Sequence, residues 1–177
     1  MRLLLISAAA FGLLTAVPAQ ASAQEAAQCP IMIAPAVFAR ELADAMSIRE
    51  TTEEEQESIG RRVKALADAC RNVHDIPDER EEDYLNLALT GIVMARLALD
   101  LEEVGIAPSS VEEALDVGEG RTNVLGEEFS DESAVKLMER LEKDGFKLDS
   151  VDESIWVKVG AYAAATGAYY TLAGSFD

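Results

Sequence analysis

The chain has 177 residues and a mass of 19.0 kDa, with 15 Lys and Arg against 33 Asp and Glu, so its formal net charge is −18. Such an excess of carboxylates repels phosphate polyanions unless the cations cluster, and they do not cluster here, which excludes binding of a nucleic-acid backbone. Hydrophobic residues make up 49 % of the chain, enough to form the core of one folded domain.

Residues 1–23 have the pattern of a secretory signal peptide. Arg2 supplies the positive start, residues 3–17 are an apolar run, and residues 19–23 read Ala-Gln-Ala-Ser-Ala. About 15 apolar residues fall short of the ~20 that a membrane-spanning helix needs. We expect cleavage after Ala23, with Ala21 fitting nearly as well, and a location in the bacterial periplasm or outside the cell.

The chain has two cysteines, Cys29 and Cys70. Export would place them in an oxidising compartment, where they are predicted to form one disulfide between the N-terminal segment and the end of a helix. Two buried free thiols are the alternative, and a redox-active pair is disfavoured because no Cys-x-x-Cys spacing is present. With His74 as the single histidine, the chain offers too few ligands for zinc, and no metal or cofactor is predicted.

The rest of the chain predicts an all-α fold, a compact bundle of about six helices in a single domain over residues 35–177. Residues 24–34 contain Pro30 and precede Pro35, so we predict an extended lead-in there. No segment shows the two-residue alternation of a β-strand. Hydrophobic periodicity and helix-capping signals predict helices over 35–47, 52–73, 77–105, 110–118, 130–145 and 150–176.

Two helix-loop-helix corners 40 residues apart have similar sequences. The helix ends at Gly105 and Gly145 are each followed by a hydrophobic residue and by a capping box that starts at Ser110 or Ser150. We interpret this likeness as the product of shared capping signals, with an internal repeat as the alternative. Residues 118–126, with three glycines, predict a flexible connector that lacks the spacing of a phosphate-binding loop.

The predicted helix 77–105 is apolar on nearly every face between residues 85 and 101, where its only charges are Arg96 and Asp100. They are four residues apart and therefore share a face. We interpret them either as an internal ion pair or as a polar spot in an apolar ligand cavity that helix 150–176 would complete with Tyr162.

Helix 150–176 has no charge from Val159 to Phe176 but is only mildly apolar, so stable membrane insertion is not predicted. The pairs Gly160/Ala164 and Ala163/Gly167 would let another helix approach closely, as in a compact bundle or a homodimer through this helix. Four aromatic residues are candidates for a pocket or an interface, with ordinary core packing as the alternative: Trp156, Tyr162, Tyr169 and Tyr170.

No catalytic residue is predicted, because His74 has no accompanying nucleophile pattern, and the acidic clusters stand at helix starts, where they are expected anyway. We therefore expect a non-catalytic interaction or binding module whose acidic surface attracts a basic protein partner. The alternatives are a carrier of a small apolar ligand in a cavity between helices, and an unrecognised hydrolase.

Overall fold

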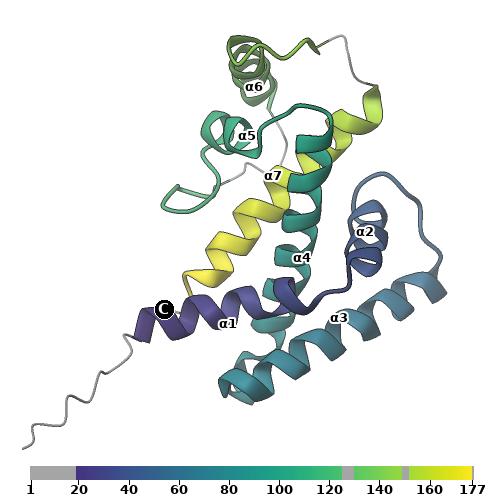
Figure 1. The fold of residues 1–177 in the computed structure, drawn as a ribbon, viewed down its shortest axis with the longest axis vertical. Helices are drawn as coiled ribbons and strands as arrows, with labels where there is room; N and C mark the ends of the chain where they lie inside the picture. Colours follow the sequence, from purple (N-terminus) through teal and green to yellow (C-terminus); the bar gives the residue numbers. More distant parts are fainter. Residues whose placement is uncertain (1–18, 125–129, 149–151, 177) are drawn as a thin grey trace, which may run out of the picture.

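The computed structural model describes residues 19–124, 130–148 and 152–176, and all regular structure within these ranges is helical (Figure 1). The all-α prediction is confirmed, with one helix more than expected. The elements are α1 (Ala19–Ile33), α2 (Ala36–Ala45), α3 (Glu53–His74), the 3-10 helix η1 (Asp78–Arg80), α4 (Glu81–Glu103), α5 (Pro108–Leu115), α6 (Asp131–Lys143) and α7 (Glu153–Ala173).

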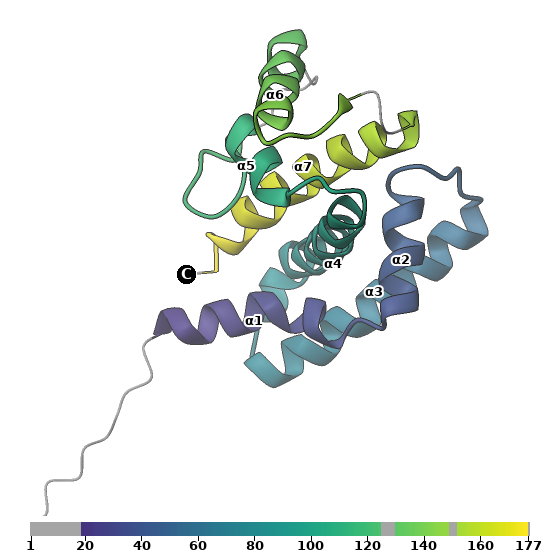
Figure 2. The same ribbon diagram turned by 45° about the horizontal axis from the view of Figure 1, so that its top comes forward.

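Helix α4 lies at the centre of the bundle (Figure 2). Its most extensive contact is with α7, and α1, α2 and α3 cover its other side, while α6 packs mainly on α5. Within the described ranges, Asp78–Glu103 is the one helical segment long and apolar enough to cross a membrane, and half of its most apolar stretch is buried in the protein. Such burial is expected for the core helix of a bundle, because a helix with apolar side chains on all faces is stable only when other helices shield those faces from water.

Several helix ends follow the local capping chemistry. Thr52 accepts a hydrogen bond from the Glu55 backbone, and the Glu55 side chain accepts one from the Thr52 backbone, so the predicted capping box of α3 is present. Ser130 caps α6 as predicted by accepting a hydrogen bond from the Ser133 backbone.

The predicted box at Ser110 is wrong. Helix α5 begins two residues earlier, because Pro108 is favoured in a first turn, and the Ser110 hydroxyl donates to Asp144 at the end of α6 instead. Ser150 lies outside the described residues, and Asp152 is the N-cap of α7.

The two predicted corners have the same geometry where their first helices end. Gly105 and Gly145 adopt φ of 85° and 87°, which a glycine reaches without steric cost. In each corner the amide two residues after the last helical turn donates back to a leucine carbonyl: Ile106 to Leu101, and Phe146 to Leu141, both at 2.9 Å. These are two Schellman caps, and the likeness of the two sequences is a likeness of helix ends.

The predicted extended lead-in over residues 24–34 is wrong, since residues 24–33 belong to α1 and Pro30 lies inside the helix. A proline has no backbone N–H, so the Ala26 carbonyl, four residues earlier, loses its helical donor. The Tyr84 hydroxyl from α4 replaces that donor at 2.7 Å, and the Tyr84 side chain is completely buried. Burial raises the pKa of Tyr84 to about 12, so the phenol keeps its proton at neutral pH.

The structure contains the predicted Cys29–Cys70 disulfide, which joins α1 to the last turns of α3. Both cysteines are buried in the core, with their Cα atoms 5.9 Å apart. The bond and the Tyr84 contact hold α1 against two different helices.

We predict that Tyr84→Phe lowers the free energy of unfolding by about 2 kcal/mol, because it leaves the buried Ala26 carbonyl without a donor. In a Pro30→Ala background the same substitution should cost less than about 1 kcal/mol, since the amide of residue 30 then donates to Ala26. Urea unfolding of the four variants of this cycle measures the difference. An equal cost of Tyr84→Phe in both backgrounds would contradict the proposed compensation.

Loss of the disulfide should lower the free energy of unfolding by roughly 4 kcal/mol in the chain-entropy model, because the bond joins residues separated by 41 positions. The measurement compares urea unfolding of the oxidised chain with that of the Cys29→Ala/Cys70→Ala variant. Intact mass with and without reductant serves as the control, since the oxidised chain must be lighter by two hydrogens.

Candidate functional site

Asp100 is the centre of a charged cluster that joins three helices. Its side chain is bound by Arg96 of the same helix and by Lys158 of α7, whose Nζ lies 2.6 Å from Oδ2. Lys158 also lies 3.5 Å from Asp44 of α2. Asp100 is only 7 % exposed, so these cations compensate a carboxylate that is nearly excluded from water. The cluster has the form of an internal ion-pair network between α2, α4 and α7.

Tyr162 does not join this cluster. Its hydroxyl donates to Glu112 of α5, and burial together with that carboxylate raises its pKa well above the ordinary value. The hollow beside Arg96 and Asp100 has a volume of about 330 Å³ and is lined mainly by charged side chains. The structure therefore does not bring Arg96, Asp100 and Tyr162 together around the apolar cavity considered for a small-molecule carrier.

Trp156 lies in an apolar groove of about 780 Å³ between α2, α6 and α7. We refer to it as the α7 groove. Its lining contains a single charged residue, and its exposed apolar surface far exceeds its polar surface. The lining residues are Met46, Ser47, Ala134, Leu137, Met138, Glu153, Trp156, Val157, Val159, Gly160, Ala161 and Ala164.

The two small-residue pairs of α7 have different environments. Ala163 and Gly167 are buried in the bundle. Gly160 and Ala164 line the α7 groove, and a Cβ added to Gly160 would meet no atom within 4 Å. One pair thus serves core packing, and the other leaves the surface of α7 open to an incoming chain.

Exposed methionines flank this open face. Met46 at the end of α2 is 54 % exposed and Met138 on α6 is 39 % exposed, while Val157 of α7 is 43 % exposed. Methionine is over-represented at adaptable binding surfaces, because its flexible thioether can fit different partners. The periodicity of each helix alone did not indicate this surface, because its members come from three helices.

The charges near the groove leave it negative. Lys136, Arg140 and Lys158 of α6 and α7 are each bound to a carboxylate. Glu153, which lines the groove, has no ion pair among the residues that the structure describes. Together with the net charge of −18, this arrangement favours a cationic neighbour.

Tyr169 and Tyr170 lie near the other end of α7, with their ring centroids 5.2 Å apart in an edge-to-face arrangement. Both line a second and more polar cavity, together with α1 and residues 119–123. Of the predicted aromatic candidates, Trp156 therefore belongs to one surface and these two tyrosines to another.

Within residues 19–124, 130–148 and 152–176, no group of three His, Cys, Asp or Glu side chains is arranged to hold a metal ion. Comparison of the chain with protein-family models, with characterised proteins and with solved structures gave no match. The function must therefore be inferred from the surfaces themselves.

We predict that Asp100→Asn lowers the free energy of unfolding by about 3 kcal/mol, because it leaves Arg96 and Lys158 without their shared carboxylate in a nearly buried setting. Glu139→Gln on the exposed side of α6 is the matched control and should change the stability by less than about 0.5 kcal/mol. Urea unfolding measures both. Equal effects of the two substitutions would show that the cluster does not stabilise the fold.

Proposed function

We propose that this protein is an exported, non-catalytic binding module that holds an amphipathic helix of a basic partner protein in the α7 groove. The observation that carries the proposal is the groove itself. It is an apolar surface hollow of about 780 Å³, with one charged lining residue, on a chain whose net charge is −18. Large exposed apolar patches with a polar surround are typical of interaction sites.

The shape and chemistry of the groove favour a helix as the bound element. Gly160 and Ala164 present little side chain, which lets the backbone of another helix come close. Met46, Met138 and Trp156 along the groove can cover apolar side chains that recur every three or four residues. Partners bound in this way place one apolar stripe in the groove and leave their polar face in water.

Charge favours a basic partner over a second copy of the chain. Two copies would each bring a net charge of −18, and like charges on facing surfaces oppose association. Cationic side chains that flank the apolar stripe of a partner helix would instead meet Glu153 and the acidic surface beyond it. Homodimerisation through α7 is therefore the less favoured alternative.

Export is supported by the disulfide. A bond between Cys29 and Cys70 is compatible with an oxidising compartment, and exported proteins are where such bonds persist. The signal-peptide pattern over residues 1–23 points the same way.

We predict that an 18-residue amphipathic peptide with a leucine stripe and flanking lysines binds the α7 groove, whereas a peptide with the same stripe and flanking glutamates binds at least tenfold more weakly. Trp156 is the only tryptophan of the chain, so its intrinsic fluorescence reports on the groove directly. The affinity for the lysine peptide should fall as salt is added, because the attraction between surface charges is screened.

Gly160→Leu is the decisive variant, because it fills the open face of α7 and should weaken peptide binding at least tenfold. Gly60→Leu is its matched control, since Gly60 is also a helical glycine with nothing within 4 Å of an added Cβ, but on α3. Equal binding by the two variants would exclude the groove as the site. Native mass spectrometry tests for the alternative occupant. If it shows a dimer that Gly160→Leu abolishes, the α7 groove binds a second copy of the chain rather than a basic partner.

A further inference from the structure

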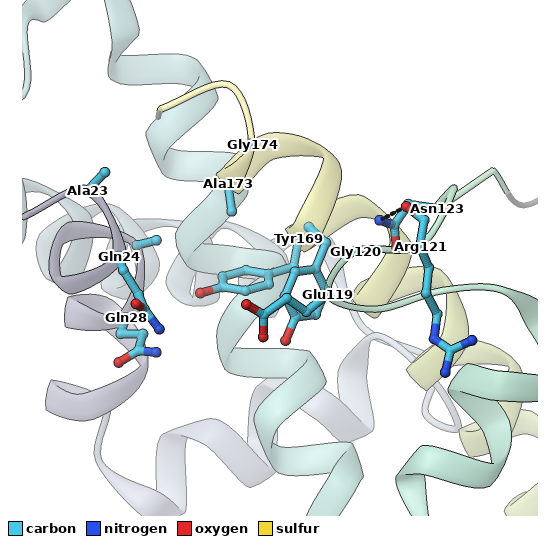
Figure 3. Close-up of a pocket in the computed structure, with 12 residues that line it drawn as sticks. Ala23, Gln24, Gln28, Glu119, Gly120, Arg121, Asn123, Tyr169, Ala173 and Gly174 are labelled. Carbon is cyan, nitrogen blue, oxygen red and sulfur yellow. Dashed lines mark hydrogen bonds between the residues drawn. The ribbon is translucent and has the colours of Figure 1, made fainter. Parts of the chain in front are cut away.

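A second cavity, of about 510 Å³, lies where α1, residues 119–123 and the end of α7 meet (Figure 3). It is more polar than the α7 groove, and it is lined in part by Gln24 and Gln28 of α1, Glu119 of the loop and Tyr169 of α7. Its volume lies within the range of small-molecule sites.

Tyr169 is closely packed beside this cavity, and its hydroxyl makes no hydrogen bond to a described residue. The ring lies against α4 at Gly91, where an added Cβ would stand 2.9 Å from Cε2 and 3.0 Å from Cδ1 of Ile31. The residue is 5 % exposed, yet its hydroxyl has no hydrogen-bond partner among the described residues. Figure 3 shows the hydroxyl pointing toward α1. The buried ring thus fixes where the hydroxyl lies, and the hydroxyl oxygen is left available to a polar group in the cavity.

The loop that carries Glu119 has a defined shape. Asn123 donates to the Gly118 carbonyl at 3.0 Å, and its own side-chain oxygen accepts from the Gly118 amide at 2.7 Å. Thr122 donates to Asp116 at 2.6 Å. Residues 118–123 of the predicted flexible connector are thus closed into a loop by hydrogen bonds, and this loop carries Glu119 beside the cavity.

The charge at the cavity is negative. Glu119 has no ion pair among the described residues, and Figure 3 shows it with Tyr169 on the side that faces Gln24 and Gln28, whereas Arg121 extends away from them. Burial raises the pKa of Tyr170, and the negative charges of Glu112 and Glu119 raise it further. Glu112 is already occupied by Tyr162, so Glu119 is the free carboxylate.

We propose that this cavity binds a primary ammonium group, with Glu119 as its charge partner and with Tyr169 Oη and a side-chain oxygen of Gln24 or Gln28 as further acceptors. An ammonium has three N–H donors and no acceptor, and these residues offer acceptors of matching number and charge. The proposal stands on residues that the α7 groove does not use.

Two sources of such an ammonium have the same chemistry. One is a free small amine. The other is the α-ammonium of the chain itself. Cleavage after Ala23 would make Gln24 the first residue, and Gln24 lines the cavity. In either case Glu119 is the carboxylate that pairs with the ammonium group.

The test begins with the exported protein, whose first residue is read from its intact mass. Binding of 1,4-diaminobutane is measured by calorimetry, with 1,4-butanediol as the uncharged probe and tetramethylammonium as the cation without N–H donors. If the site takes a free amine, Glu119→Gln should weaken diamine binding at least tenfold and Tyr169→Phe at least threefold, while Glu139→Gln leaves it unchanged. The two control probes should bind at least tenfold more weakly than the diamine.

If Gln24 is the first residue and fills the site, added diamine should not bind, and the pKa of the α-amino group should lie above its ordinary value of about 8. An NMR titration of that group then shows its pKa falling in Glu119→Gln and unchanged in Glu139→Gln. The proposal is wrong if Glu119→Gln alters neither diamine binding nor the α-amino pKa. Equal binding of tetramethylammonium and diamine would also overturn it, because the N–H donors would then play no part.

Discussion

Helix α4 imposes the constraint on which the rest of the structure depends. Because it is apolar on nearly every side, it is stable only when other helices enclose it, and α1, α2, α3 and α7 do so. Enclosure also buries its polar groups, which must then be compensated. The Ala26 carbonyl of α1 accepts a hydrogen bond from the Tyr84 hydroxyl, and Lys158 of α7 helps to neutralise Asp100. The helices that cover α4 therefore also provide partners for its buried polar groups.

The same constraint determines which surfaces remain free. Since α7 gives one face to α4, the opposite face with Gly160 and Ala164 is left for the surface, and α6 packs mainly on α5 rather than covering it. The α7 groove is therefore a consequence of the order in which the helices surround the core. The polar cavity arises at the end of α7, where the ring of Tyr169 packs closely against α4 at Gly91 and the residue also lines the cavity.

Local chemistry made much of the fold predictable, and long-range compensation accounts for the rest. Thr52 and Ser130 locate helix starts because capping acts within three residues. Helix α1 was missed because the defect caused by Pro30 is repaired by Tyr84, which lies 58 positions beyond Ala26 in the chain. Lys158, equally distant from Asp100, could not be assigned to the ion pair for the same reason. Trp156 was a candidate from its chemistry alone, whereas Met46, Met138 and Glu119 become neighbours of their sites only through packing.

The contact between Gly91 and Tyr169 has a consequence for sequences that share this fold. A residue larger than glycine at position 91 would need a ring-free side chain at position 169, and the aromatic ring at 169 in turn requires glycine on α4. The proline of α1 and the tyrosine of α4 that supplies its missing donor form a second interdependent pair. Distant relatives should therefore exchange both members of each pair together, and this covariation gives a way to recognise them when overall identity has been lost.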